Sequence, residues 1–297
     1  MDNYINGFMD YLSNEKRMAK NSQQAYKRDI SEFAAMVQEK EIEDLSQINN
    51  TEVVAFLLKL KNEGKSSATV NRKLSSIRAF YNYMTEKGYS EKNPTLNIKS
   101  PKIDKKQVEY LTLDEVDRLL SLPEDTVKGK RDKAMLEVLY ATGIRVTEMI
   151  EMDVEDVNLR MGFVACTGEH SKPRIIPLGR PAREALEVYI YEGRPKILKD
   201  KDENHEKALF LNYAGERLTR QGLWKVLKEY AKLAEIENKL NPQILRNSFA
   251  AHMIQNGADL KSLQELLGHE DITTTQVYLS VSKNHIKEVY DKAHPRA

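Results

Sequence analysis

The sequence predicts a mainly α-helical protein with two domains, the second of which also contains a small antiparallel sheet. The chain has 297 residues, whereas a single domain commonly contains about 150. Apolar residues recur at helical spacing along most of the chain. Two prolines and five lysines interrupt this pattern between 89 and 110. We therefore expect a helical domain at 1–88, a basic linker at 89–110 and a second domain at 111–297.

Four helices are expected in the first domain, where they would form a compact bundle. The first surrounds residues 5–12, and the second runs through Gln38. The third closes near Gly64, and the fourth ends near Gly88. The residues expected to cap the last three helices are Asn21 or Ser22, Thr51, and Ser66 or Ser67.

The second domain is expected to combine helices with one β-hairpin. A capping box in Thr112-Leu113-Asp114-Glu115 opens it. Phe163 to Cys166 and Arg174 to Ile176 are short strand-like runs, which would pair around 167–173. Helices are expected at about 113–121, 130–141, 146–151, 181–191, 219–236, 242–256, 259–267, 271–280 and 284–292.

Basic charge is concentrated near the end of the first domain. The whole chain has a net charge of +1, yet residues 59–106 hold 12 basic and 4 acidic residues, a net charge of +8. A local basic surface is typical of a protein that binds a polyanion, and the alternative is a solvated, lysine-rich surface. The residues expected to contact phosphate are Arg72, Lys73 and Arg78, opposite the apolar face of the fourth helix, and Lys102, Lys105 and Lys106 in the linker.

The sequence argues against several other classes of protein. No apolar run approaches the ~18 residues of a membrane-spanning helix, and the first residues do not read as a secretory signal. Cys166 is the only cysteine, so neither an internal disulfide nor a thiolate metal cluster is expected, and a reducing, cytoplasmic setting fits. A nucleotide-binding loop of the form G-x-x-x-x-G-K-[ST] is absent.

Four residues of the second domain could act together on a phosphate. Arg145 follows Gly143 at a helix break, Arg246 lies in the first turns of a helix, and Tyr278 comes nine residues after His269. Two arginines can hold a phosphate by bidentate hydrogen bonds, and a histidine can donate to it or move a proton. A tyrosine hydroxyl can attack phosphorus and form a covalent intermediate. No carboxylate pair for two metal ions accompanies them, so phosphoryl transfer without metal or ATP is the chemistry that this set allows.

Each of these residues also has an ordinary structural explanation. A tyrosine on an amphipathic helix usually serves packing, and His269 could cap a helix end. Arg145 and Arg246 could form surface salt bridges. Each explanation is common for one residue, but the occurrence of all four in this order is much rarer.

The chain resembles the tyrosine recombinases, specifically the Xer type, with the phage integrases as relatives. The motifs that carry the resemblance are A-T-G-I-R-V-T-E at 141–148, L-R-N-S-F-A at 245–250, L-L-G-H with its tyrosine at 266–278, and H-P-R-A at 294–297. Together they are highly specific and extend over nearly the whole chain. The resemblance implies a helical core-binding domain and a catalytic domain that hold duplex DNA from opposite sides.

The resemblance also implies a role for each residue of the set. Arg145 and Arg246 would hold the scissile phosphate, His269 would hydrogen-bond it, and Tyr278 would attack it, leaving a 3′-phosphotyrosyl link and a free 5′-hydroxyl. The family cuts and rejoins DNA at specific sites, and no cofactor is implied. It works as a tetramer on two DNA sites, here a homo-tetramer or a hetero-tetramer with a related recombinase. The segment 285–297 would dock on a neighbouring subunit.

The sequence departs from the family pattern at positions that matter for proton transfer. The family hairpin usually reads G-K-G-x-K-x-R-x-x-P-L, with its first lysine as general acid, and Glu169 stands at that position. Lys172, three residues further along, could take over the acid role, and His170 is a second candidate. Gln243 replaces the histidine of His-x-x-Arg and can donate a hydrogen bond but carries no proton. Asn247 replaces the histidine of the usual Arg-His.

These departures leave three functions to compare. The first is an active site-specific recombinase, the second is a weakened or silent DNA-binding accessory protein, and the third is a relaxing enzyme similar to type IB topoisomerases. Retention of Tyr278, both arginines and His269 favours the active recombinase. Loss of a general acid typically slows a reaction about 10²–10⁴-fold without abolishing it. Chromosome dimer resolution, element integration and inversion are all compatible with the sequence.

Overall fold

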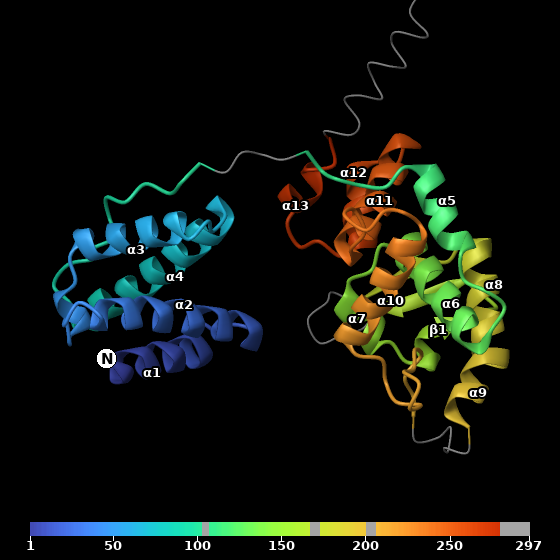
Figure 1. Cartoon of the computed structure of the whole chain (residues 1–297), viewed down its shortest axis with the longest axis horizontal. Coiled ribbons are helices and arrows are strands. Elements are labelled where there is room, and N and C mark those ends of the chain that lie inside the picture. The colour runs from blue at the N-terminus through green and yellow to red at the C-terminus, as the bar shows by residue number, and fades with distance from the viewer. Residues whose placement is uncertain (103–106, 167–172, 200–205, 280–297) are drawn as a thin grey trace, which may run out of the picture. The chain divides into compact units, whose positions relative to one another are not determined.

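The computed structural model describes residues 1–102, 107–166, 173–199 and 206–279 (Figure 1). The chain divides into two compact units, Met1–Lys106 and Gln107–Ala297, which are called unit 1 and unit 2 below. The division falls inside the stretch in which the sequence predicts a linker. Each unit has its own hydrophobic core, so each is described by itself.

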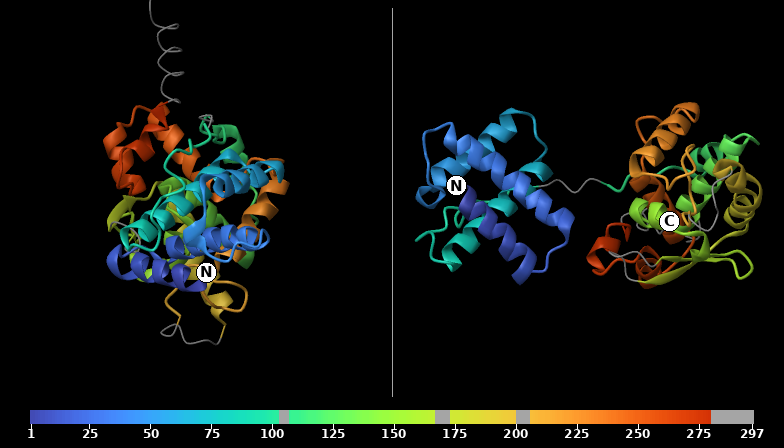
Figure 2. Two further views of the ribbon diagram at one scale, coloured as in Figure 1. Left: turned by 90° about the vertical axis from the view of Figure 1, so that its left-hand side faces the viewer. Right: turned by 90° about the horizontal axis from the view of Figure 1, so that it is seen from below.

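Unit 1 is built from four helices around an aromatic core. They are α1 (Asp2–Asp10), continued by a π-helical turn (Tyr11–Glu15), α2 (Lys20–Gln38), α3 (Asn50–Asn62), preceded by a 3₁₀ turn (Leu45–Gln47), and α4 (Ser67–Glu86). Figure 2 shows the four helices gathered into one group. Phe8, Phe33 and Phe80 are fully buried, and Phe8 meets Phe80 edge to face with 5.4 Å between ring centroids. The four expected helices are confirmed, and Ser66 caps α4 as expected.

Two of the expected helix caps in unit 1 are wrong. Helix α2 begins at Lys20, so Asn21 lies inside the helix rather than before it. Helix α3 begins after Asn49 and not at Thr51. The reason is a capping box, in which the Glu52 carboxylate accepts a hydrogen bond from the Asn49 N–H at 2.9 Å.

Contacts within unit 1 occupy much of the α4 face that the sequence assigns to phosphate binding. Lys73 is only 5% exposed, so its expected place on an open surface is wrong. Its ammonium group lies 3.5 Å from Asp29 Oδ1 and also pairs with Glu32. Arg72 pairs with the same buried Asp29. Because Asp29 lies on α2, far away in the sequence, a count of charges along α4 cannot detect this network.

The first part of the predicted linker is bound to α4. Arg78 donates to Ser100 Oγ at 3.0 Å and also to the carbonyl oxygen of Ile98. Asn71 Nδ2 donates to the carbonyl oxygen of Pro101 at 2.8 Å. Arg78 therefore already has partners in unit 1, although its side chain remains partly exposed.

Unit 2 is mainly helical and contains a three-stranded antiparallel sheet. Its helices are α5 (Leu113–Ser121), α6 (Val127–Thr142), α7 (Val146–Glu151), α8 (Arg180–Val188), α9 (Arg194–Leu198), α10 (Arg220–Leu233), α11 (Pro242–Gln255), α12 (Leu260–Leu267) and α13 (Thr273–Gln276). The sheet has the order β1 (Val157–Asn158), β2 (Phe163–Cys166), β3 (Arg174–Pro177). The expected hairpin is confirmed, with Val164 opposite Ile176. Strand β1 adds a third strand that was not predicted.

Helix α6 is the central helix of unit 2. Residues 134–139 of this helix are nearly all buried, and α5, α8 and α11 pack against it. The capping box predicted for α5 is present, because the Thr112 hydroxyl accepts from the Glu115 N–H at 3.2 Å and Glu115 accepts from the Thr112 N–H at 2.9 Å. Of the helix expected at 271–280, the described residues contain α13 (Thr273–Gln276), and the helix expected at 284–292 lies outside the described residues.

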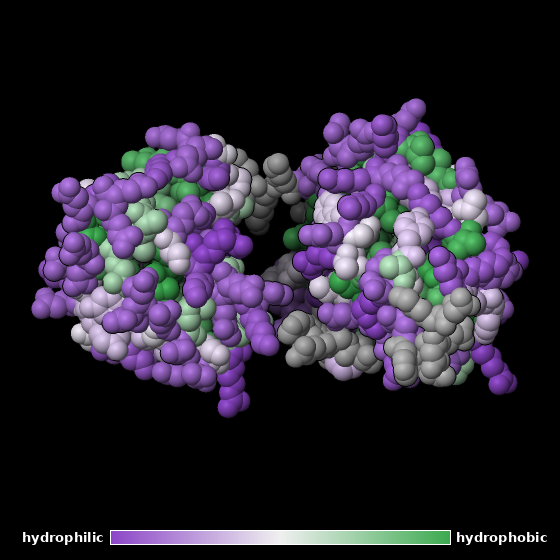
Figure 3. Space-filling model, turned by 60° about the horizontal axis from the view of Figure 1, so that its bottom comes forward, coloured by the Kyte–Doolittle hydropathy of each residue, from purple (hydrophilic) through white to green (hydrophobic). Residues whose placement is uncertain are grey.

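The face of each unit that Figure 3 shows is mostly polar. On the face shown in Figure 3, hydrophilic residues cover most of both units, with small apolar areas between them. Among the described helices, none combines the length and the apolar character that crossing a bilayer requires.

Replacing Lys73 with alanine is expected to destabilise unit 1. The change removes one cation from the fully buried Asp29, and breaking a buried ion pair typically costs ~3–5 kcal/mol. Since Arg72 and Ser76 also contact Asp29, we expect a loss of about 3 kcal/mol in the free energy of unfolding, measured by urea denaturation. The control Lys59→Ala, in an exposed ion pair, should change it by less than about 1 kcal/mol. Equal stability of the two variants would contradict the buried network.

Candidate active site

A glycine turn between α6 and α7 positions Arg145. Helix α6 ends at Thr142, and Gly143 adopts φ +57° and ψ +24°, a left-handed conformation that glycine adopts without strain. A Cβ atom on Gly143 would lie 2.4 Å from Phe249 Cδ1. The turn makes Arg145 the N-cap residue of α7, with 37% of its side chain exposed.

The buried carboxylate of Glu148 binds two arginines. Glu148 is 4% exposed and accepts from Arg145 Nη1 at 3.0 Å and from the Arg145 backbone N–H at 2.6 Å. Arg174 of β3 donates to the same carboxylate at 2.8 and 3.0 Å. Burial opposes the charge on Arg174, but Glu148 outweighs it and raises the pKa of Arg174. The sequence analysis placed Arg174 in a predicted strand but did not name it as a site residue, although the arginine of the hairpin motif was a signal for it.

Arg246 lies in the interior of unit 2. It is 5% exposed and donates to the carbonyl oxygen of Gly143, which lies in the turn that precedes Arg145. Burial lowers the pKa of Arg246 to about 10, and repulsion from Arg145 is the second cause. The side chain therefore still carries its charge at neutral pH.

The C-terminal end of α12 brings the three arginines together. Three consecutive carbonyl oxygens each accept a hydrogen bond from a different arginine. These bonds join Leu266 to Arg174 Nε at 2.7 Å, Leu267 to Arg246 Nη2 at 2.7 Å, and Gly268 to Arg145 Nη2 at 2.8 Å. The last carbonyls of a helix lack intrahelical partners and carry partial negative charge, so cations are stabilised there.

His269 follows this helix end and is neutral in the structure. Its Nε2 lies 2.9 Å from Arg246 Nη2, which can only donate, so Nε2 accepts. Its Nδ1 then carries the proton and donates to Thr275 Oγ1 of α13 at 2.8 Å. Burial and the charge of Arg246 lower the pKa of His269 to about 4. The residue that caps α12 is Gly268, which adopts the left-handed conformation. Helix capping therefore does not explain why a histidine stands at position 269.

Tyr278 is buried beside this cluster. It is 2% exposed and belongs to a small apolar cluster with Phe249, Leu263 and Leu267. Its hydroxyl donates to Asn247 Oδ1 at 3.0 Å. Burial raises the pKa of Tyr278, and Arg246 partly opposes the rise. The tyrosine follows the short helix α13 and does not lie on a long amphipathic helix.

The two amide residues at the usual histidine positions contact each other. Gln243 is exposed, and its Nε2 donates to Asn247 Oδ1 at 2.9 Å. Asn247 thus touches both Gln243 and Tyr278. Sequence reasoning treated Asn247 as a minor departure, because a contact with Tyr278 across 31 residues leaves no local pattern.

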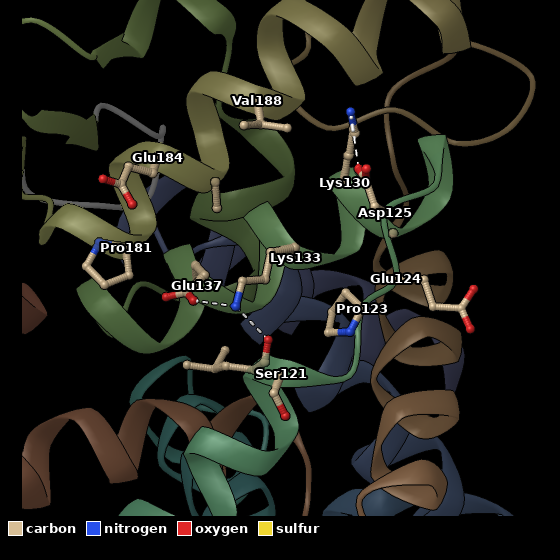
Figure 4. A pocket seen from close by; sticks show the side chains of 13 residues that line it. Ser121, Pro123, Glu124, Asp125, Lys130, Lys133, Glu137, Pro181, Glu184 and Val188 are labelled. Atoms are coloured by element: carbon tan, nitrogen blue, oxygen red, sulfur yellow. Dashed lines mark hydrogen bonds and ion pairs between the residues drawn. The ribbon is translucent and has the colours of Figure 1, made fainter.

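Two hollows in unit 2 differ in their suitability for phosphate. One, of about 370 Å³, is lined by Arg145 and Arg246 together with Trp224 and Gln243. The other, of about 420 Å³, also contains lysines, but their ammonium groups are neutralised (Figure 4). The ion pairs there are Lys130 with Asp125 at 3.3 Å and Lys133 with Glu137 at 2.9 Å. The first hollow suits an anion better, because arginines line it and none of its lining residues is acidic, whereas Glu124, Asp125, Glu137 and Glu184 line the second.

The structure brings together four of the residues that the sequence predicts for the site, and the roles of the others stay predictions. Arg145, Arg246 and His269 meet at the end of α12, and Tyr278 lies next to them through Asn247. Lys102 is described and exposed. The residues that lie outside the described parts of the chain are Lys105, Lys106, Glu169, His170 and Lys172. Among the described residues, no group of three or more His, Cys, Asp or Glu side chains could hold a metal ion.

Because its folded-state pKa is lowered, His269 is expected to link stability to pH. The ordinary histidine value is 6.5, and the value in the folded protein is about 4, so the neutral form is favoured by folding. Its contribution to stability is complete above pH 6.5 and is lost as the pH falls towards 4. NMR titration of the His269 ring, assigned with a His269→Gln variant, should show no protonation near pH 6. A normal midpoint would contradict the lowered pKa of His269.

Models of two protein families match the chain. The phage integrase family matches residues 109–285, and the phage integrase N-terminal SAM-like domain matches residues 5–88. Tyrosine recombinase XerD of Oceanobacillus iheyensis is 45% identical over 294 residues, which cover 99% of this chain and 98% of that protein. Tyrosine recombinase XerD of Listeria innocua is 43% identical over 299 residues, with 100% of both chains covered.

Solved recombinase structures share the fold. XerH site-specific recombinase bound to a palindromic difH substrate superimposes with a TM-score of 0.77 at 20% identity, over 96% of this chain and 94% of that one. A lambda integrase dimer bound to a COC′ core site gives a TM-score of 0.70 at 18% identity, over 94% of each chain. With the family models covering both units and full-length relatives above 40% identity, this chain belongs to the phage integrase family, as a tyrosine recombinase of the Xer type.

Proposed function

We propose that this recombinase cuts and rejoins duplex DNA at two specific sites, with Tyr278 as its nucleophile. The observation that carries the proposal is the convergence of Arg145, Arg246 and His269 at the end of α12, beside a buried tyrosine. Two guanidinium groups at one hollow can bind a phosphodiester through charge-assisted hydrogen bonds. The cytoplasmic setting expected from the sequence stays a prediction.

The reaction is a transfer of a phosphodiester from DNA to the tyrosine and back. The Tyr278 oxygen bonds to phosphorus as the bond from phosphorus to the 5′-oxygen breaks, and the leaving oxygen takes up a proton. The product is a 3′-phosphotyrosyl link with a free 5′-hydroxyl. A 5′-hydroxyl from a second strand reverses the step, so the energy of the phosphodiester is retained and no nucleotide cofactor is needed.

The arginines and His269 stabilise the negative charge on the phosphate oxygens. Arg145 and Arg246 are fixed by the α12 carbonyls before DNA arrives, so they are preorganised for the developing charge. A phosphate beside His269 raises the pKa of its imidazole, because a nearby anion favours the charged form. The protonated ring then donates a hydrogen bond to the phosphate.

We assign the proton donor for the leaving 5′-oxygen to the segment that joins β2 and β3. Lys172 is the proposed general acid, because a lysine on this hairpin is the family's usual donor and Glu169 stands at the usual position. Unless buried, a glutamate is ionised at neutral pH and cannot donate a proton. His170 is the second candidate. All three residues lie outside the described parts of the chain.

The assembly on DNA is proposed to be a tetramer. Solved relatives of the same fold include a lambda integrase dimer and a XerH complex, both bound to DNA. A homo-tetramer, or a hetero-tetramer with a related recombinase, would join two sites. Candidate DNA contacts in unit 1 are the exposed Arg72 and Lys102, together with Arg78, Lys105 and Lys106.

One observation favours the alternative of a weakened enzyme or silent accessory protein. Gln243 stands where a proton-carrying histidine is usual, and its amide is bound to Asn247. A DNA-dependent covalent complex would decide against the silent protein. If covalent complex forms but the reaction does not depend on paired sites, the topoisomerase-like alternative is favoured instead.

The variant Tyr278→Phe is expected to abolish covalent attachment to DNA and to leave DNA binding close to wild type. It removes only the hydroxyl from a ring that packs in an apolar cluster. The measurement is gel detection of covalent protein on a nicked suicide duplex, with a mobility-shift assay for binding. Tyr140→Phe, which removes a hydroxyl bound to His252, is the matched control and should retain attachment. Undiminished covalent complex in Tyr278→Phe would refute the nucleophile.

The variant Lys172→Ala is expected to slow cleavage of ordinary DNA about 10²–10⁴-fold, the usual effect of a lost general acid. A duplex with a 5′-bridging phosphorothiolate should restore the rate, because sulfur leaves without protonation. Glu169→Lys should raise the rate on ordinary DNA. The control Lys196→Ala, on α9, should match wild type on both substrates. If Lys172→Ala also matches wild type on both, Lys172 is not the acid and His170 is tested next.

A further inference from the structure

Asn247 holds the hydroxyl of the proposed nucleophile. Tyr278 donates to Asn247 Oδ1 at 3.0 Å, and Gln243 Nε2 donates to the same oxygen at 2.9 Å. The third contact of the amide is made by its nitrogen, which donates to the carbonyl oxygen of Glu109 at 3.0 Å. The side chain therefore links α11, the segment before α5, and the tyrosine after α13.

The contact with Glu109 fixes the orientation of the Asn247 amide. A backbone carbonyl can only accept hydrogen bonds, so the amide nitrogen must face Glu109. The amide oxygen then faces Gln243 and Tyr278, and both of these must donate. The reverse orientation would place two oxygens against each other at Glu109 and two nitrogens against each other at Gln243.

This orientation favours the phenol form of Tyr278. A phenol can donate to an amide oxygen, whereas a phenolate would face the partial negative charge of that oxygen. An amide also cannot accept a proton, so Asn247 cannot act as a general base. A histidine at 247, as in the usual Arg-His, could instead take or give a proton.

We propose that Asn247 is a positioning residue that holds Tyr278 as a buried phenol in the DNA-free protein, with Gln243 fixing the Asn247 amide. The proposal rests on Tyr278 being the nucleophile. To attack phosphorus, the tyrosine must give up both its proton and this hydrogen bond. Asn247 therefore opposes the ionisation of the nucleophile until the phosphate is in place.

Among the described residues, the other charged groups around Tyr278 do not explain why it is held as a phenol. Arg246 of α11 acts on the tyrosine in the opposite sense, because a cation favours the phenolate. On α12, the charged side chains of Lys261 and Glu265 are exposed, and so is the Glu109 side chain in the segment before α5. His269 is neutral and turned toward Arg246.

The test compares Asn247→Ala with Asn247→Asp. Both variants lose the amide nitrogen that binds Glu109, but only the aspartate keeps an acceptor, now charged, for the Tyr278 hydroxyl. The measurement is the single-turnover cleavage rate against pH on a nicked 5′-phosphorothiolate duplex, in which the leaving group needs no proton. Asn256→Ala, at the C-terminal end of the same helix, is the matched control and should have the wild-type profile.

The two variants should shift the pH profile in opposite directions. Loss of a net hydrogen bond of about 1 kcal/mol corresponds to roughly 0.5–1 pH unit. Asn247→Ala should therefore lower the midpoint of the alkaline rise by that amount and speed cleavage about 3–10-fold below it. Asn247→Asp should raise the midpoint and slow cleavage. Unshifted profiles would overturn the proposal, because the hydrogen bond to Asn247 would then have no effect on the ionisation of Tyr278. Shifts in the same direction would overturn it as well, because loss of the Glu109 contact, which both variants share, would account for them.

A second measurement does not depend on catalysis. The ionisation of Tyr278 can be followed by NMR of ¹³Cζ-labelled tyrosine in the DNA-free protein, with Tyr278→Phe used to assign the signal. Asn247→Asp, which is nearly the same size as asparagine, should raise the Tyr278 pKa, and an unchanged or lower value would overturn the proposal. If Tyr278→Phe still attaches to DNA, the proposed nucleophile fails. If attachment is lost in Tyr278→Phe but the midpoints do not move, only the role of Asn247 fails.

Discussion

The meeting of three guanidinium groups at the C-terminal end of α12 is the interaction on which the site depends. Arg145, Arg174 and Arg246 would repel one another if no anion or dipole separated them. The buried carboxylate of Glu148 binds two of them, and three successive helix-end carbonyls bind all three. Unit 2 therefore holds its cations with groups that the fold itself supplies.

The packing of the arginines also explains why positions 143 and 268 are glycines. Gly268 has φ +63°, and a Cβ atom there would lie 2.7 Å from Arg174 Nη1. Gly143 lies in the turn whose carbonyl accepts from Arg246. At both positions a side chain would displace an arginine or an aromatic neighbour, besides straining the backbone. The two glycines therefore allow the arginines to take their positions, because Gly143 lies in the turn before Arg145 and Gly268 lies against Arg174.

The sequence predicted the helices and the hairpin well because apolar periodicity and turn residues are local signals. It also brought Arg145, Arg246, His269 and Tyr278 into one set. Its main errors concern long-range pairing, whereas the misplaced cap of α3 comes from a local pattern, the Asn49-x-x-Glu52 capping box. Lys73 was placed on an open surface because its partner Asp29 belongs to another helix.

The remaining omissions have the same origin. Arg174 joins the cluster through Glu148, 26 residues away, and Asn247 reaches Tyr278 across 31 residues. Such contacts follow from packing, and no spacing rule within a single helix can supply them.

The depressed pKa values of Arg246 and His269 have a consequence for phosphate binding. Both values are lowered by burial and by neighbouring cations, so the DNA-free site is short of negative charge. In the proposed reaction, a phosphodiester would supply that charge and stabilise the protonated forms, and by linkage this would strengthen its own binding. The proposed nucleophile, Tyr278, follows α13 and is held by Asn247 rather than by the arginine cluster. The cluster can therefore stay rigid for the phosphate while Tyr278 changes its partner, so that charge stabilisation and release of the nucleophile are separate functions of neighbouring elements.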